Sequence, residues 1–208
     1  MTQPSLSILI PTVVGREENL NKLTRLLFGK SIGNEDMIGY MGGMIGEIHL
    51  VIAKDNKEMT IGQKRELLYS KAEGLYSIQI DDDDELAPNA IKIILEAIKS
   101  NPEMPCITFR EKCIINGEYK SSNHSIKYGR WQDNFDGYDY VRTPFYKDVI
   151  RTDLAKSVPF PHIRWNEDEQ WSYAIMPLLT SEIHIDEELY YYNYNETNPI
   201  ERYGLDRT

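Results

Sequence analysis

The first hundred residues alternate three times between a short apolar run and a segment of helical periodicity, and this alternation constrains the fold most. The apolar runs lie at 6–10, 47–53 and 76–80. Each is followed by apolar residues at helical spacing, for example Ile91, Ile94 and Ile98 after the third run. Strands that alternate with helices build parallel sheets through right-handed crossovers. We therefore predict an α/β protein with a mostly parallel central sheet flanked by helices.

The second half of the chain has a different character. Residues 106–115 and 118–120 flank Asn116-Gly117, a dipeptide that favours two-residue hairpin turns, which predicts a smaller β-hairpin element. Residues 120–140 show no clear period. The remaining predicted elements are a helix at 166–176, strands at 182–185 and 189–194, a glycine-rich loop at 29–46, and a helix end at Gly74. No segment has the composition of a linker, so a single domain is predicted.

Composition and charge exclude several classes of protein. The chain has 23 basic and 33 acidic residues, which gives a formal net charge of −10. Proteins that coat phosphate backbones rely on Lys and Arg, so nucleic acid is an improbable partner. No apolar run approaches the roughly 18 residues needed to span a bilayer, and no signal peptide is visible. Two cysteines, Cys106 and Cys113, cannot form a disulfide scaffold, and we expect a cytoplasmic protein without integral membrane association.

Five consecutive acidic residues, 81–85, follow the third predicted strand. Such a run is often a solvated loop. Here, however, it lies at the carboxyl end of a strand, where α/β sheets place their ligands. In an extended segment Asp81 and Asp83 point to the same side, and paired carboxylates suit Mg²⁺ or Mn²⁺ bound together with substrate phosphates. This spacing favours a cation and diphosphate site.

Four motifs along the chain together resemble family-2 inverting glycosyltransferases of the GT-A fold. The first is Ser7-Ile8-Leu9-Ile10-Pro11-Thr12, which is similar to the opening strand of that family. Residues 78–84 resemble the strand that runs into its D-x-D-D motif, and 62–65 resemble the helix between them. Residues 167–171, Glu-Asp-Glu-Gln-Trp, are similar to the E-D-x-x-W motif that carries the catalytic base. The resemblance spans roughly residues 5–195.

The resemblance implies a single GT-A (Rossmann-like) domain over 1–208. Residues up to about 100 would bind the nucleotide sugar, and about 101–208 would bind the acceptor. It further implies a metal-dependent transfer of a sugar from a nucleotide-diphosphate donor, a UDP-sugar first, to an acceptor hydroxyl with inversion. Asp168 would be the general base, with Glu167 beside it, and Asp83 with Asp81 would hold Mn²⁺ or Mg²⁺. The implied donor-binding residues are Pro11, Thr12, Val13, Arg16, Asp55, Lys64, Arg65, Asp81 and Asp82.

The acceptor is the least specified partner. Sugars stack on aromatic rings, so Trp131, Trp165 and Trp171 are candidate acceptor contacts, and a glycan is the expected acceptor. His184 is a candidate late metal ligand, although a lone histidine is more often a residue of a sheet.

Two other functions remain open at this stage. A nucleotidyltransferase also places carboxylates and a metal ion beside a nucleotide, but it has no use for the acidic cluster at 167–171. A catalytically silent module that binds nucleotide sugars would have the same fold. The released product, a nucleoside diphosphate or pyrophosphate, distinguishes the two enzymes, and turnover of a donor distinguishes either from the silent module.

Overall fold

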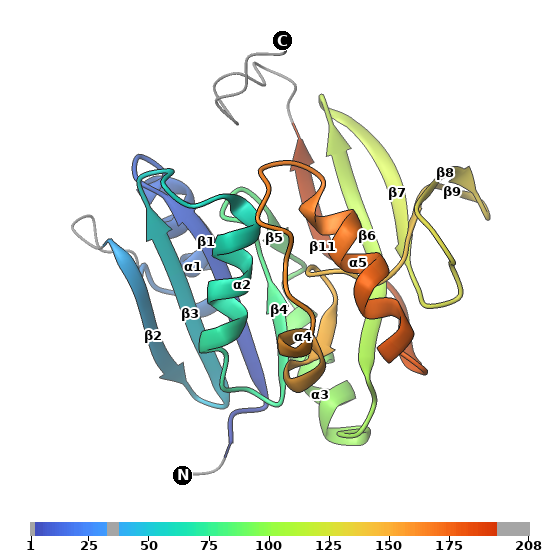
Figure 1. The fold of residues 1–208 in the computed structure, drawn as a ribbon, viewed down its shortest axis with the longest axis horizontal. Coiled ribbons are helices and arrows are strands. Elements are labelled where there is room, and N and C mark those ends of the chain that lie inside the picture. The colour runs from blue at the N-terminus through green and yellow to red at the C-terminus, as the bar shows by residue number, and fades with distance from the viewer. Residues whose placement is uncertain (1–2, 33–37, 195–208) are drawn as a thin grey trace.

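The computed structural model describes residues 3–32 and 38–194. Within these residues eleven strands form one sheet in the order β2-β3-β1-β4-β10-β6-β7-β9-β8, and β11 pairs with both β5 and β6. The strands up to the acidic run are β1 (Leu6–Val13), β2 (Gly39–Ile45), β3 (Ile48–Asp55), β4 (Tyr76–Gln79) and β5 (Glu85–Leu86). The later strands are β6 (Cys106–Ile115), β7 (Glu118–His124), β8 (Gln132–Phe135), β9 (Tyr138–Arg142), β10 (Val149–Arg151) and β11 (Glu182–Tyr194) (Figure 1).

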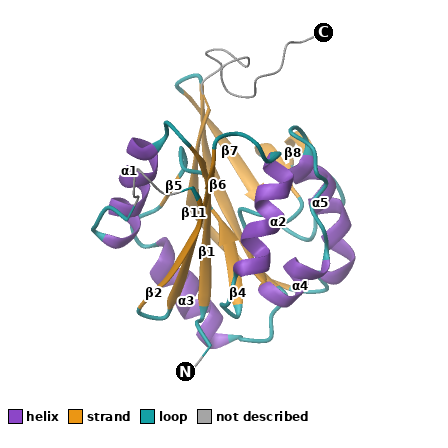
Figure 2. Cartoon of the chain, turned by 60° about the vertical axis from the view of Figure 1, so that its left-hand side comes forward, coloured by secondary structure: helices purple, strands orange, loops and turns teal. Residues whose placement is uncertain are grey.

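Helices cover both faces of the sheet. They are α1 (Glu17–Phe28), α2 (Ile61–Lys71), α3 (Ala90–Ser100), α4 (Thr152–Ser157) and α5 (Glu167–Ile175), followed by a 3₁₀ turn at Met176–Leu178. Figure 2 shows α1 and α3 on one face and α2, α4 and α5 on the other. This three-layer arrangement confirms the predicted α/β class, with a large central sheet flanked by helices.

Each face of the sheet has its own hydrophobic core, and β1 contributes to both. Ile8 and Ile10 pack in the core under α1 and α3, whereas Leu9 packs in the core under α2, α4 and α5. The alternation follows from the period of two along a strand. Because both faces of β1 are buried, its sequence is a continuous apolar run rather than an alternating one.

The parallel part of the sheet is smaller than predicted. β1 pairs in parallel with β3 and β4, as the alternating pattern of the first half implies. Beyond these three strands the sheet is mixed: β2 is antiparallel to β3, and β10 is antiparallel to both β4 and β6. The strand–helix alternation ends after α3, and the chain then returns through the predicted hairpin of β6 and β7 at Asn116-Gly117. Strand directions in that half are set by these later connections.

Three local predictions are wrong. Residues 39–45 of the predicted glycine-rich loop form the edge strand β2, because pairing with β3 needs only backbone groups. The two late strands are one strand, β11, whose register shifts around Glu188. Gly74 is not the residue that ends α2, which stops at Lys71; a Cβ at Gly74 would lie 2.5 Å from the backbone nitrogen of Ser7, so glycine is required for close approach to β1.

Within residues 3–32 and 38–194, no helix combines the length and the apolar character that crossing a bilayer requires.

Candidate active site

A cleft of about 930 Å³ opens where β1 and β4 end. Thr12 lines it from the end of β1 and Asp81 from the residues after β4, while Arg65 comes from α2 and Asp168 from α5. Four segments far apart in sequence therefore meet at the carboxyl ends of parallel strands, the place where α/β sheets bind ligands. The cleft volume lies within the range of about 300–1,000 Å³ that ligand pockets occupy.

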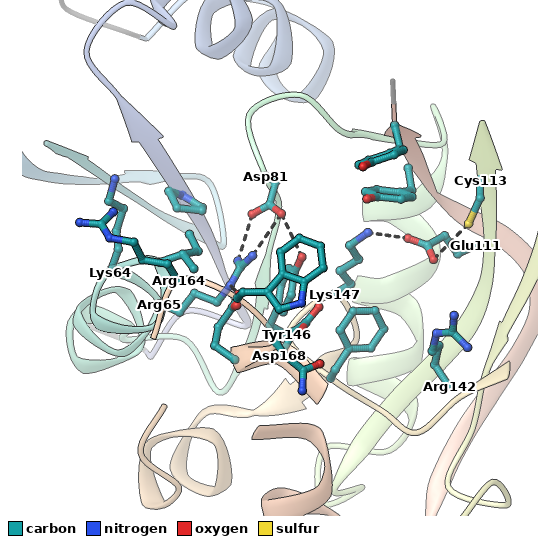
Figure 3. A pocket seen from close by; sticks show the side chains of 18 of the residues that line it. Lys64, Arg65, Asp81, Glu111, Cys113, Arg142, Tyr146, Lys147, Arg164 and Asp168 are labelled. Carbon is teal, nitrogen blue, oxygen red and sulfur yellow. Dashed lines mark hydrogen bonds and ion pairs between the residues drawn. The ribbon is translucent and has the colours of Figure 1, made fainter. Parts of the chain in front are cut away.

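Arg65 connects the acidic residues of this cleft. Its guanidinium makes a bidentate contact with Asp81, with N–O distances of 3.0 and 3.2 Å, and its Nε donates to Glu167 at 3.1 Å. The guanidinium carbon lies 3.4 Å from the centre of the Tyr146 ring, and the Tyr146 hydroxyl donates to Asp81 at 2.9 Å (Figure 3). Arg65 is 3% exposed. Arg65 therefore holds two predicted site carboxylates, Asp81 and Glu167, in place.

The pKa values of the two carboxylates that contact Arg65 are shifted in opposite directions. Burial alone would raise the pKa of Asp81, but the adjacent Arg65 outweighs it, so the pKa of Asp81 is lowered. Burial raises the pKa of Glu167, and the attraction of Arg65 offsets only part of that effect. Asp81 is consequently held as a carboxylate against Arg65.

The middle of the acidic run is tied to the end of β1. The Thr12 hydroxyl donates to Asp82 at 2.6 Å, and Arg16 forms ion pairs with Asp82 at 2.7 Å and with Asp83 at 3.0 Å. Burial raises the pKa of Asp82 to about 7, although Arg16 opposes this. Asp83 is the more accessible of the two, with a side chain that is 22% exposed. Asp82 is thus a structural member of the turn, while Asp83 reaches solvent.

The end of the acidic run is tied to β11. Asp84 is buried and accepts hydrogen bonds from the Tyr190 hydroxyl at 2.9 Å and from the Asn193 backbone at 3.2 Å. The Tyr190 hydroxyl in turn accepts from the backbone nitrogen of Asp81 at 3.3 Å. Burial raises the pKa of Asp84, and the nearby Lys147 ammonium, 3.6 Å away, opposes the shift. The conformation of the acidic run therefore depends on a strand more than a hundred residues later.

The two predicted metal ligands, Asp81 and Asp83, each form an ion pair with an arginine. Asp81 has both oxygens bound by Arg65 and also receives the Tyr146 hydroxyl. Among the described residues, no group of three His, Cys, Asp or Glu side chains is arranged to hold a metal ion. His184, the candidate late ligand, lies on the first part of β11 and contacts the hydroxyl of Thr108 on β6 at 3.0 Å. Asp83, which pairs with Arg16 at 3.0 Å, is not among the described residues that line the cleft, so a hard cation held there would take its other ligands from water and from the phosphates of a ligand.

The end of β1 and the first part of α2 form the other wall of the cleft. Pro11, Thr12 and Val13 line it. Lys64 also lines it, where it donates to the Thr12 carbonyl at 2.7 Å and forms an ion pair with Asp55. Burial lowers the pKa of Lys64, and Asp55 offsets part of this shift.

Asp55 lies behind this wall. It is 4% exposed and is not among the described residues that line the cleft; its carboxylate accepts from Lys64 and from the Met59 backbone at 2.8 Å. In this arrangement Asp55 would not contact a ligand bound in the cleft. Its observed contact is instead with Lys64, which it orients.

Asp168 enters the cleft from the first turn of α5. The helix follows Asn166, whose φ of 62° is a left-handed conformation that Asn tolerates better than most residues. One oxygen of Asp168 accepts from the Glu169 backbone at 2.9 Å, which fixes the side chain near the helix start. Asp168 is half-buried and lines the same cleft as Asp81. The two motifs that lie 87 positions apart in the sequence are thus brought into one cavity.

The three predicted tryptophan contacts divide into two kinds. Trp131 and Trp165 line the cleft, and Trp165 is 62% exposed. Trp171 is fully buried and stacks on Phe160, with ring centres 4.6 Å apart, and on Tyr69 at 5.5 Å. The prediction that Trp171 contacts the acceptor is therefore wrong: one turn along α5 from Glu167, it points into the core beneath α2 rather than into the cleft.

Several residues of the cleft have no counterpart in the sequence analysis. Tyr146 and Lys147 lie in a segment without periodicity, and Glu111 and Arg142 are charged residues on strands β6 and β9. No local pattern marks any of these four. For Tyr192 a signal does exist, the spacing of two between Tyr190, Tyr192 and Tyr194 on one predicted strand.

His124 gives the fold a dependence on pH. It is fully buried, 3.2 Å from Asp148 and 3.3 Å from Glu111. Burial alone would lower its pKa, but the two carboxylates outweigh this and raise the pKa to about 9.

A raised histidine pKa stabilises the fold below the unfolded value of about 6.5, and the stabilisation is lost as the pH rises towards 9. The free energy of unfolding should therefore fall between pH 6.5 and 9, measured by urea denaturation, and His124→Gln should flatten this slope. A wild-type slope that persists unchanged in His124→Gln would contradict the assignment.

Comparison with known proteins shows what the fold has in common with others. No protein-family model matches the chain, and no curated protein matches it in sequence. Solved structures of S. aureus TarS, a glycosyltransferase, are similar in fold. TarS 1-349 in complex with UDP-GlcNAc has a TM-score of 0.58 and 14% sequence identity, covering 95% of this chain and 60% of that one. TarS 1-349 in complex with UDP has a TM-score of 0.57 and 14% identity, covering 91% and 60%.

The crystal structure of S. aureus TarS matches with a TM-score of 0.57 and 14% identity, over 91% of this chain and 37% of that one. The chain thus spans less than two thirds of each TarS structure that it matches. At this level of identity the likeness concerns the fold alone: the chain shares its α/β fold with these TarS structures.

Proposed function

We propose that this chain transfers a sugar from a nucleoside diphosphate donor to the hydroxyl of an acceptor, with inversion at the anomeric carbon. The observation that most supports this function is that Asp81 and Asp168, from two distant acidic motifs, line one cleft. The cleft lies in a fold shared with TarS, whose crystal structures hold UDP and UDP-GlcNAc. UDP-GlcNAc is therefore the first donor to test, and the expected acceptor is a glycan.

The chemical step is a single displacement. The acceptor oxygen forms a bond to the anomeric carbon while the bond from that carbon to the diphosphate oxygen breaks, and the electron pair leaves with the diphosphate. Asp168, which is half-buried in the cleft, takes the proton of the attacking hydroxyl. A positioned base of this kind contributes roughly 10²–10⁴-fold. One displacement on the face opposite the leaving group inverts the anomeric centre.

The leaving diphosphate requires positive charge nearby. Lys64 lines the cleft beside the Thr12 carbonyl and supplies one cationic group on the donor side. Asp83 is the carboxylate that would hold Mn²⁺ or Mg²⁺, and the bound ion would supply Lewis-acid stabilisation of the departing diphosphate. Arg65 is committed to Asp81 and Glu167, so its role is to position those carboxylates rather than to contact the donor.

A panel of sugar nucleotides tests this proposal. UDP-GlcNAc, UDP-glucose, UDP-galactose and GDP-mannose are each mixed with the protein in Mn²⁺, Mg²⁺ or EDTA, and the melting temperature and the released nucleoside diphosphate are measured. One donor should raise the melting temperature and be hydrolysed slowly, and EDTA or Asp83→Asn should abolish both effects. Asp186→Asn is a matched control, because Asp186 is 79% exposed and pairs with Arg110 outside the cleft.

Each other outcome points to a different function. In a parallel reaction that contains a nucleoside triphosphate and a sugar 1-phosphate, release of pyrophosphate would identify a nucleotidyltransferase. Stabilisation by one donor, with no turnover after a panel of acceptors has been added, identifies a binding module. If no donor changes the melting temperature under any condition, the proposed function is wrong.

A further inference from the structure

At the end of the cleft away from Lys64, the wall is formed by one face of the sheet. Glu111 on β6 pairs with Ser122 on β7, and Ser122 pairs with Tyr140 on β9. On the other side of β6, Tyr192 of β11 pairs with Cys113. Because side chains alternate along a strand, Glu111 and Cys113 point to the same face, together with the residues paired to them. All five residues line the cleft, so they form a continuous surface, which we call the β6 face.

One buried hydroxyl on the β6 face has no hydrogen-bond partner in the part of the chain that the structure describes. Ser122 is 1% exposed, and its Oγ finds no hydrogen-bond partner among the residues that the structure describes. Buried polar groups are nearly always paired, so an orphaned hydroxyl in the wall of a cavity indicates a place where a bound molecule completes the hydrogen bonding.

Next to Ser122 lies an ion pair that offers both donors and acceptors. Lys147 Nζ is 2.8 Å from Glu111, and Cys113 Sγ donates to the same carboxylate at 3.4 Å (Figure 3). Lys147 and Glu111 are each 4% exposed, yet both line the cleft. A hydroxyl group both donates and accepts, so a pair of opposite charges side by side complements a molecule that carries several hydroxyls.

Aromatic rings border the same surface. Lys147 Nζ lies 3.7 Å from the centre of the Tyr192 ring, and the rings of Tyr192 and Tyr194 stack with centres 6.2 Å apart. Tyr140 and Trp131 also line the cleft. The negative faces of such rings attract the C–H groups of a sugar ring, whose opposite edge carries its hydroxyls.

Each cation beside the β6 face is paired with a carboxylate, although Glu111 is shared between Lys147 and His124, which has Asp148 as a second partner. Lys147 pairs with Glu111, and Arg142 pairs with Asp133 at 3.1 Å. This end of the cleft consequently has no surplus positive charge with which to select a phosphate or a carboxylate. Single-stranded nucleic acid also stacks on aromatic rings, but its phosphates need unpaired cations, and the chain has a net charge of −10.

We propose that the β6 face is the acceptor subsite and that it binds a neutral sugar ring. Ser122, Lys147 and Glu111 hydrogen-bond its hydroxyl groups, and Tyr192 packs against its C–H face. The inference rests on the proposed glycosyl transfer for its assignment to the acceptor, whereas the binding of a neutral sugar can be tested without turnover.

Saturation-transfer NMR on the full chain tests the binding directly. The probes are the methyl β-glycosides of glucose, galactose and N-acetylglucosamine, the methyl glycoside of glucuronic acid, and the oligonucleotide dT₁₀. At least one neutral glycoside should bind, and Ser122→Ala should weaken its binding roughly two- to tenfold, the size of one hydrogen bond. Because no hydrogen bond within the described protein is lost, the melting temperature of Ser122→Ala should match that of the wild type.

Ser77→Ala is the matched control. Ser77 lies on β4, is fully buried, and its Oγ also has no hydrogen-bond partner among the described residues, but it does not line the cleft. Its replacement should leave glycoside binding unchanged. Equal effects of the two substitutions would show that Ser122 acts through the fold and would overturn the proposal.

The remaining outcomes separate this inference from the proposed function. If a donor is hydrolysed but no neutral glycoside binds, or if glucuronide or dT₁₀ binds more tightly, the subsite is wrong and the transferase proposal stands. If no donor is turned over but a neutral glycoside binds in a Ser122-dependent manner, the sugar site is supported and its assignment to an acceptor falls.

Discussion

Replacing Asp168 with asparagine should lower kcat for sugar transfer by roughly 10²–10⁴-fold, the usual contribution of a general base. Asparagine keeps the shape of the side chain and the hydrogen bond that one oxygen accepts from the Glu169 backbone. It cannot accept the proton of the acceptor hydroxyl. The variant should therefore fold normally and bind the donor as the wild type does.

Glu169→Gln provides the matched control for this measurement. Glu169 is the next residue on α5 and is half-buried like Asp168, but its carboxylate accepts from the Tyr173 hydroxyl at 2.7 Å rather than lining the cleft. Its kcat should stay close to that of the wild type. A kcat for Asp168→Asn within tenfold of the wild type, in a protein with normal donor binding, would remove Asp168 from the role of base.

Replacing Arg65 with methionine should lower the free energy of unfolding by about 3–5 kcal/mol, the cost of breaking a buried ion pair by removing one partner. Arg65 is 3% exposed, and its loss leaves the carboxylates of Asp81 and Glu167 without their shared cation. Urea denaturation measures the change. Arg65 lowers the pKa of Asp81, so this part of the stability is lost as the pH falls through the native pKa of Asp81. The difference between the two proteins should therefore narrow in acid.

An exposed ion pair shows whether burial is the cause. Lys22 pairs with Glu85 at 2.6 Å, but the Lys22 side chain is 69% exposed. Lys22→Met should change the free energy of unfolding by less than about 1 kcal/mol. If Arg65→Met were no more destabilising than Lys22→Met, burial of the ion pairs of Arg65 with Asp81 and Glu167 would not be a source of stability.

The sequence predicts best where the information is local. Strands β1, β3 and β4 are short segments rich in apolar residues with a helix after each, and this pattern predicts their parallel pairing and the cleft at their carboxyl ends. The acidic run at 81–85 and the cluster at 167–171 are compact motifs whose meeting in one cleft follows from the resemblance to family-2 enzymes. Pattern and motif together thus account for the half of the site on the side of Thr12 and Asp81.

The rest depends on contacts between distant segments, which no local pattern encodes. β2 is a run of glycine and methionine that becomes a strand because the edge of β3 is available to it. Trp171 lies within the recognised motif, yet it faces Phe160 and Tyr69 in the core. Tyr146 has no sequence signature, since its importance comes from the position of its ring against Arg65.

The double pairing of β11 has a consequence for the order in which the molecule is assembled. Tyr190 and Asp84, which join β11 to the acidic run, are 106 residues apart in the chain. Contacts at such separations form late, because closing a long loop costs entropy before any contact repays it. While the chain is being synthesised, β1, β3 and β4 can pair before β11 exists, and the acidic run then lacks the hydroxyl that orders it. The acidic run and the β6 face should therefore reach their final geometry together, when β11 docks.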